Sequence, residues 1–248
     1  MHEISIKAEE LFSIGSWPIT NAVLLALVTF LVLVSASVTL RRKLALIPGK
    51  IQNFFEMFVE GALTIMESVL GSRVLAEKYL PLVATVFLFI IVSNWLGLLP
   101  GVGSLGFHGE SDGKETFIPL FRSPGSDLNF TVVLAIISVV SVNALGFIAL
   151  GFKRYASKFF HPRNPILSFA GALELVSEFV KIVSFSFRLF GNVFAGEVLL
   201  MIIGFLVPYL VPLPFLFLEV FVGFIQAFIF SMLTLVFIAM AISHHEAH

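Results

Sequence analysis

Residues 166–214 read ILSFAGALELVSEFVKIVSFSFRLFGNVFAGEVLLMIIGFLVPYLVPLP, and this stretch decides the fold. The apolar run continues to Ile242 with one break, where Pro208, Pro212 and Pro214 lie close together. Because prolines end helices and favour turns, the stretch predicts a helical hairpin with arms at 166–207 and 213–242. The first arm would be about 63 Å long, roughly twice the hydrocarbon thickness of a bilayer. We therefore expect the hairpin to be strongly tilted in a membrane.

The composition of the whole chain agrees with a membrane environment. Of its 248 residues, 58% are hydrophobic and only 12% are charged, and the mean hydropathy is +1.02. One soluble core of this size cannot bury so much apolar surface, so we predict a single all-α integral membrane domain over residues 1–248. The absence of cysteine excludes disulfides, thiolate metal sites and cysteine nucleophiles. The net charge of −1 gives no indication of a nucleic-acid partner.

Other segments complete the expected membrane topology. Three more apolar runs are long enough to cross a bilayer; they lie at about 17–40, 79–100 and 129–152. The segment at about 51–74 is amphipathic, and Glu56, Glu60 and Glu67 are expected to form its solvated face. The sequence thus predicts five membrane crossings plus one interfacial helix.

Basic residues orient these crossings. One group follows the first span (Arg41, Arg42, Lys43), and a second precedes the hairpin (Lys153, Arg154, Lys158, Arg163). The 101–128 connection is acidic by comparison, and the 208–214 turn carries no charge. The positive-inside rule then predicts an N-terminus outside and a C-terminus in the cytoplasm.

Polar side chains interrupt the first arm of the hairpin: Glu174, Glu178, Lys181, Arg188, Asn192 and Glu197. An ionised group at mid-membrane costs from about 2.5 to over 10 kcal/mol, so several in one segment indicate a function or a partner. At 100° per residue, Glu174, Lys181, Ser184 and Asn192 fall within about 40° of Arg188, whereas Glu197 lies about 180° away. The arm therefore has a polar stripe around Arg188 and a separate acid on its opposite face.

Residues at equal depth in an antiparallel hairpin have a nearly constant index sum. The pair Arg188 and Gln226 sums to 414, and the pair Glu197 and Glu219 sums to 416. We expect each pair to be level, with the two glutamates nearer the outside and Glu174 near the cytoplasmic face. This order predicts two offset half-paths separated by a fixed cation.

The residue types suit proton exchange with a partner helix. Arginine stays protonated, so it cannot relay a proton, but it favours the ionised form of a nearby carboxylate. Glutamates release and accept protons. The small residues Gly191, Ala195 and Gly196 allow another helix to approach closely, so a mobile proton carrier is expected to belong to a partner.

The string RLFGNVFAGE at 188–197, with QAFIF at 226–230, resembles the signature of subunit a of F-type ATP synthases. The resemblance extends to PGKIQ at 48–52, NWLGLLP at 94–100 and the Asp127-Leu-Asn129 triplet, and to Glu174, fourteen residues before the arginine. It covers nearly the whole chain except the first fifteen residues and the 101–123 connection.

The resemblance implies a non-catalytic stator subunit in a bacterial inner membrane. Arg188 would face a carboxylate of the c-subunit ring, with Asn192 and Gln226 beside it. The outer half-channel would be lined by Glu197 and Glu219, together with Asp127, and the inner one by Glu174. The b-subunit stalk would be a further partner, and the F1 sector an indirect one. Family members often have an acid at only one of the positions 197 and 219, whereas this chain has two, which leaves the order of proton transfer there open.

Several residues keep a second interpretation. Arg188 could simply pair with Glu174 or Glu178 inside the bundle. Lys181 either lies on the arginine stripe or extends to the membrane interface. Asp127 is equally suited to a helix N-cap.

Further polar residues are expected to be structural. Asn94 is expected to pack between helices, and the terminal histidines (His244, His245, His248) are expected to form an exposed tail. No nucleophile–base pair, phosphate loop or metal-ligand cluster occurs, so we predict no catalytic site, cofactor or metal.

Two other functions compete with the stator. A self-contained secondary transporter usually shows two related halves, and no such internal symmetry is present in the chain. A mere scaffold leaves a mid-membrane arginine unexplained.

Overall fold

The computed structural model describes residues 8–15, 17–45, 47–99, 101–111, 114–151, 155, 165–208 and 210–243. Most of them are helical. The long helices are α1 (Asn21–Arg42), α2 (Lys50–Leu70), α3 (Arg73–Gly97), α4 (Leu128–Leu150), α6 (Pro165–Leu206) and α7 (Pro212–Ser243). All of these except α2 are long and apolar enough to cross a membrane. The predicted all-α membrane fold is confirmed.

Short elements fill two of the connections. Two antiparallel hairpins pair β1 (Glu10–Ile14) with β2 (Trp17–Thr20) and β3 (Gly106–Ser111) with β4 (Lys114–Pro119). Two 3₁₀ turns, η1 (Val102–Ser104) and η2 (Pro124–Ser126), flank the second hairpin. η2 brings the end of this connection against α3, α4 and α6.

The first membrane helix begins later than the apolar run suggests. Residues 17–20 form β2, and α1 starts at Asn21, where the Thr20 side chain accepts a hydrogen bond from the Val23 amide (3.3 Å). The apolar composition of this run suits a strand as well as a helix, and pairing with β1 decides between them. The expected interfacial helix ends at Leu70, because the next residue, Gly71, has a left-handed backbone (φ 70°), and α3 starts soon after, at Arg73.

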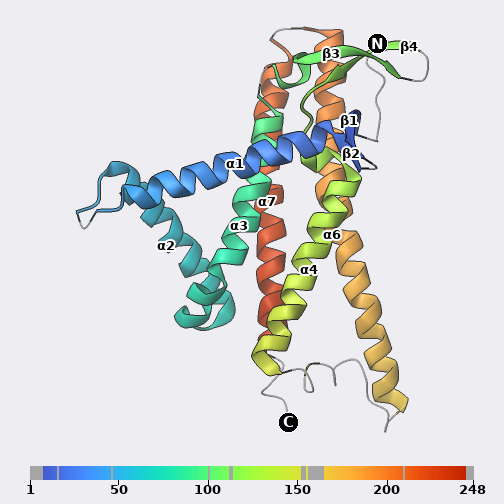
Figure 1. The fold of residues 1–248 in the computed structure, drawn as a ribbon. Coiled ribbons are helices and arrows are strands. Elements are labelled where there is room, and N and C mark those ends of the chain that lie inside the picture. The colour runs from blue at the N-terminus through green and yellow to red at the C-terminus, as the bar shows by residue number, and fades with distance from the viewer. Residues whose placement is uncertain are drawn as a thin grey trace.

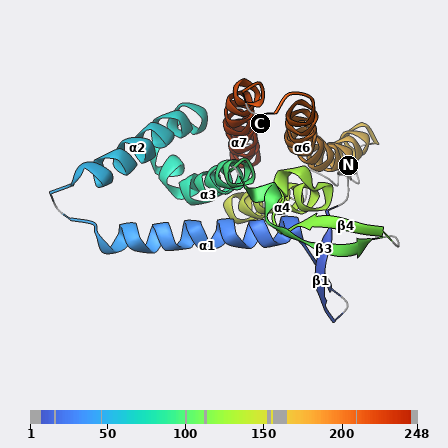
Figure 2. The same ribbon diagram turned by 90° about the horizontal axis from the view of Figure 1, so that it is seen from above.

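The long helices form a bundle with one crossing member. Helices α3, α4, α6 and α7 pack together, and α2 extends from the corner where it meets α3 (Figure 1). Helix α1 runs across this bundle in Figure 1, and Figure 2 shows that it lies along one side of the bundle, next to α3 and α4. Since α1 and the hairpin point in such different directions, they cannot both stand upright in one bilayer, which agrees with a tilted hairpin.

Two apolar clusters hold the bundle together. The central cluster joins α3, α4, α6 and α7, and its most buried members include Ile90, Ala135, Leu189 and Ala227. The second joins α2, α3, α4 and α7 and includes Leu235 and Ile238.

Polar contacts fasten the helices at fixed levels. The Thr131 and Ser186 hydroxyls of α4 and α6 lie 3.1 Å apart, and those of Ser138 and Thr234 in α4 and α7 lie 2.9 Å apart. The Trp95 indole N–H of α3 donates to the Val220 carbonyl of α7 (3.1 Å). Hydrogen bonds of this kind satisfy polar groups that lipid cannot, and they fix the level of α6 and α7 against their neighbours.

Candidate functional site

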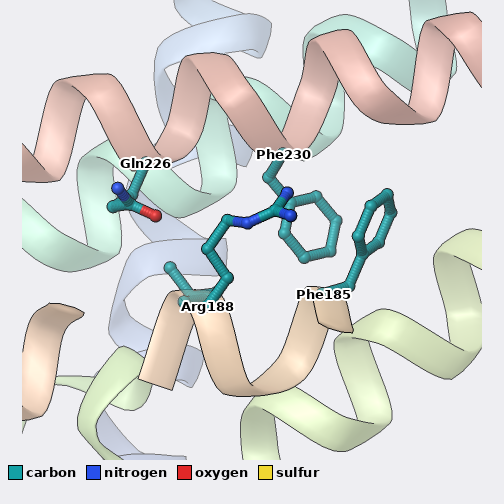
Figure 3. A pocket seen from close by; sticks show the side chains of 5 residues that line it. Phe185, Arg188, Gln226 and Phe230 are labelled. Atoms are coloured by element: carbon teal, nitrogen blue, oxygen red, sulfur yellow. The ribbon is translucent and has the colours of Figure 1, made fainter. Parts of the chain in front are cut away.

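Arg188 lies midway along α6 and extends toward α7. Its side chain lines a shallow pocket with Phe185, Leu189, Gln226 and Phe230, and Figure 3 shows it between Gln226 and the two phenylalanine rings. The arginine and the glutamine thus lie at one level, as their index sum indicates. Phe185 and Leu189 are buried and anchor this turn of α6 in the central cluster.

The arginine charge has no counterion inside the described part of the chain. One guanidinium nitrogen donates to the Ser184 hydroxyl (3.3 Å), and the Asn192 amide donates to the Arg188 carbonyl (2.8 Å). No described carboxylate lies within ion-pair distance of Arg188. The alternative in which Arg188 simply pairs with Glu174 or Glu178 therefore does not describe this structure.

A group of polar side chains gathers near the hairpin turn; we call it the turn-side cluster. Its members are Asn94, Arg122, Ser123, Asp127, Glu197 and Glu219. The Arg122 Nε lies 3.4 Å from Glu197 Oε1 and donates to the Ser126 hydroxyl (3.2 Å). At 1.5 Å per residue, Glu197 is about 13 Å along α6 from Arg188.

Glu219 lies deep in the turn-side cluster and against the backbone of α6. The residue is 8% exposed, and its carboxyl occupies the space where a side chain at Gly196 would begin. Only glycine permits this approach. Glu197 follows Gly196 directly, and the two carboxyls lie close enough for their charges to interact. The two acids are therefore brought together, in agreement with their index sum.

Several buried polar atoms of the turn-side cluster find no hydrogen-bond partner among the described residues. They are both amide atoms of Asn94, the Ser123 hydroxyl and Glu197 Oε2. Unpaired groups at this density are costly unless water satisfies them. The turn-side cluster is therefore chemically suited to hold water.

The structure assigns Asp127 a capping position. Its carboxylate accepts a hydrogen bond from the Asn129 amide (3.0 Å) at the start of α4, and the residue is 4% exposed. The N-cap interpretation is thus confirmed, and any role of Asp127 in a proton path is additional to it.

A second polar group lies at the other end of α6; we call it the far-end cluster. It comprises Asn143, Tyr155, Glu174, Glu178 and Lys181. Glu178 accepts from Lys181 (2.7 Å) and from the Asn143 amide (3.1 Å), and the Tyr155 hydroxyl donates to Asn143 (2.6 Å). Glu178 is about 15 Å along α6 from Arg188.

Within the far-end cluster, Lys181 points into the protein. Its ammonium group lies 4.6 Å from the centre of the Phe237 ring of α7 and is paired with Glu178. The side chain is only 15% exposed, so of its two interpretations the extension to the membrane interface does not describe this structure. Burial, together with the charges of Glu178 and Glu174, raises the pKa of Tyr155 to about 12.

The expected solvated face of α2 is confirmed, since Glu56, Glu60 and Glu67 are exposed, and two of these acids also join a surface network around Arg73. Arg73 contacts Glu60 (2.6 Å), Glu67 (3.8 Å) and Glu77 (3.3 Å) at the α2–α3 corner. The hydrogen bond from Arg73 lowers the pKa of Glu60. This network fastens α2 to α3 and lies apart from the hairpin.

Three members of the turn-side cluster were not expected from the sequence to take part in the site. Arg122 and Ser123 belong to the 101–128 connection, where Arg122 counts only as a loop charge, and Asn94 was expected to pack between helices. The signal for Asn94 is its isolated amide inside an apolar run. The basic group Lys153, Arg154, Lys158 and Arg163 and the terminal histidines lie outside the described residues.

Among the described residues, no group of three or more His, Cys, Asp or Glu side chains could hold a metal ion. The fold and the hairpin charges define a helical membrane protein with ionisable groups at membrane depth, a feature typical of ion-translocating proteins. The family model described as ATP synthase A chain matches residues 21–239. The chain belongs to this family.

Individual relatives match over nearly their full length. The chain is 38% identical to ATP synthase subunit a of Campylobacter jejuni strain 81-176 over 225 residues, which are 91% of this chain and 89% of the relative. It is 33% identical to ATP synthase subunit a of Moorella thermoacetica over 240 residues, 97% of this chain and 99% of the relative.

Proposed function

We propose that this protein is the fixed membrane subunit of a rotary ATP synthase and supplies two offset half-paths for protons. Its partner is a ring of c subunits whose carboxylates pass Arg188 one after another. Proton flow through the two half-paths turns the ring and is thereby coupled to ATP synthesis. The chain itself performs no covalent chemistry.

The observation that carries this proposal is the position of Arg188. Its cation lies between two separate polar clusters, has no counterion in the described chain and is exposed next to Gly191, around which there is open space. A charge of this kind at membrane depth requires an anion from elsewhere. A carboxylate on a neighbouring helix of another subunit meets that requirement.

The two clusters define the proposed half-paths. Protons enter from outside along a path lined by Glu219, Glu197 and Asp127, where the unpaired polar atoms of the turn-side cluster favour water. They neutralise a ring carboxylate, travel with the ring and leave near Glu174 toward the cytoplasm. Arg188, with Asn192 and Gln226 beside it, blocks a direct passage because a fixed cation repels protons.

The surroundings follow from the same proposal. The protein spans a bacterial inner membrane with its N-terminus outside and its C-terminus in the cytoplasm, as its basic residues indicate. The b-subunit stalk holds it, and the F1 sector is reached through that stalk. A charge that crosses 100 mV yields about 2.3 kcal/mol, so several protons are needed for each ATP.

The test is ATP-driven proton pumping by the whole complex in membrane vesicles, followed with a pH dye for Arg188→Ala and wild type. We expect pumping to fall to background while the complex still assembles, and passive leak through the membrane sector to rise. Arg73→Gln, which changes an arginine of the surface network, is the matched control and should pump normally. Normal pumping by Arg188→Ala would overturn the proposal.

A second measurement separates the stator from a self-contained transporter. The chain is first purified from membranes under mild conditions, and its co-purifying proteins are identified. It is then separated from them and reconstituted alone. A stator co-purifies with small hairpin subunits and stalk helices in the first step and moves no ions in the second. Ion transport by the isolated chain would favour the transporter.

A further inference from the structure

The turn-side cluster holds two carboxyls but gives only one of them a defined cationic partner. Arg122 lies 3.4 Å from Glu197, and the same Nε donates to Ser126 in η2, which fixes the direction of the guanidinium. These are two of the contacts that Arg122 makes. Arg122 is largely buried, so solvent screens the pair little.

Glu219 is in the opposite situation. It is more deeply buried than Glu197, and among the described residues no hydrogen bond or ion pair reaches its carboxyl. Its neighbours are the backbone at Gly196 and the carboxyl of Glu197. A buried carboxyl that has no partner and lies beside an anion is stable when it carries a proton.

We propose that Arg122 is a positioning residue that keeps Glu197 ionised, so that Glu219 is the carboxyl that takes up and releases the transported proton. This inference rests on the proposed function. A proton from the outer water binds the Glu219 carboxylate, forms an O–H bond and then passes to a ring carboxylate. Glu219 returns to its ionised form, while Glu197 and Arg122 keep their charges throughout.

The turn-side cluster also contains an acid and an amide outside this pair. Asp127 lies at the start of α4, where its carboxylate caps the helix, and α3 contributes the neutral Asn94 to the turn-side cluster. The connection that carries Arg122 also contains Glu110, Lys114 and Glu115 in its sequence. The proposal concerns three residues of this cluster, Arg122, Glu197 and Glu219, which we call the triad.

The proposal predicts how charge changes in the triad shift proton release. In wild type the Arg122–Glu197 pair is neutral next to Glu219. Arg122→Gln leaves an extra negative charge, which holds the proton on Glu219 more tightly. Glu197→Gln leaves an extra positive charge, which releases it more easily. The double variant is neutral again.

The experiment measures ATP-driven pumping by the whole complex in inverted vesicles as a function of lumenal pH, because the lumen corresponds to the outside. We expect Arg122→Gln to move the midpoint of this profile to higher pH by about one unit. Glu197→Gln should move it to lower pH by a similar amount. The double variant should return to the wild-type midpoint, as should the charge-conserving Arg122→Lys.

A merely structural role for Arg122 would lower the amount of assembled complex without producing opposite shifts. If Arg122→Gln alone does not assemble, the other two variants still test the inference. The pumping midpoint should move to lower pH in Glu197→Gln and return to the wild-type value in the double variant. An unshifted midpoint in Arg122→Gln, or assembled Glu197→Gln complexes that do not pump, would overturn the inference. Normal pumping by Arg188→Ala would instead remove the proposed function on which it rests.

Discussion

The two ends of α6 hold their polar side chains in opposite ways. In the far-end cluster, Glu178 has a cation and an amide donor, and Tyr155 completes the chain of contacts through Asn143. In the turn-side cluster, Asn94, Ser123 and one oxygen of Glu197 find no partner among the described residues. The hydrogen-bonding groups of the far-end cluster are satisfied by protein groups, whereas several of those in the turn-side cluster are not.

This difference indicates that the far-end cluster serves stability and the turn-side cluster serves transport. A saturated buried network has a single arrangement, and any rearrangement breaks strong contacts, so it fixes helices at defined positions. An unsaturated buried network must draw on water, and water exchanges protons and positions quickly. We therefore expect variants of the turn-side cluster to change pumping and variants of the far-end cluster to change assembly.

Among variants that compare the two clusters, the largest effect is expected from closing the gap between α6 and Glu219. In Gly196→Ala the new methyl group would occupy the space of the Glu219 carboxyl, which must move away. We expect pumping to fall about tenfold or more with normal assembly, because misplacing a reacting group is costly. Gly204→Ala lies on the same helix with open space around it and serves as the control. Equal pumping by the two variants would contradict the proposed importance of Glu219.

A somewhat smaller effect is expected at the far-end cluster. Lys181→Met removes the cation that lies 2.7 Å from Glu178, in a site where both side chains are mostly buried. Removing one partner of a buried ion pair costs about 3–5 kcal/mol, so the yield of assembled complex should fall severalfold. Adding Glu178→Gln removes the carboxylate charge that Lys181 balanced and should restore the yield. If the double variant assembles no better than the single one, the pair does not have the structural role inferred here.

The smallest effect concerns Tyr155, which lies between α4 and α6. Its pKa of about 12 exceeds the ordinary value of about 10. The unfolded chain therefore loses this proton first, and the stability that the neutral hydroxyl contributes is present below about pH 10 and lost as the pH rises toward 12. A difference titration of tyrosinate absorbance between wild type and Tyr155→Phe reports this midpoint directly. A midpoint near 10 would show that Tyr155 is not enclosed in the far-end cluster.

The hairpin could be predicted closely from the sequence because its signals are local. A long apolar run and one proline-rich break place the arms at 166–207 and 213–242, and the helices occupy Pro165–Leu206 and Pro212–Ser243. The start of α1 could not be placed because residues 17–20 are apolar enough for either a helix or a strand. The start of α3 was obscured by the charges near Arg73, which the structure uses in contacts with α2.

The candidate site, like the fold, could be predicted from the sequence only in part. The levels of Arg188 with Gln226, and of Glu197 with Glu219, follow from helix geometry once a hairpin is assumed. The contact between Arg122 and Glu197 joins a loop to a helix 75 positions later in the sequence, and no periodicity encodes it. The unpaired amide of Asn94 likewise depends on how η2 packs against α3.

The crossing direction of α1 has a mechanical consequence. Helices packed side by side slide most easily along their common axis, and a ring that pushes on α6 would load the bundle laterally. Helix α1 packs on α3 and η2 across that axis, and its first residue, Asn21, is fully buried and donates to the Pro119 carbonyl (3.3 Å). Because α1 crosses the bundle axis, the other helices cannot slide past one another along that axis without breaking their contacts with α1. A sideways force on the bundle is therefore resisted by these contacts.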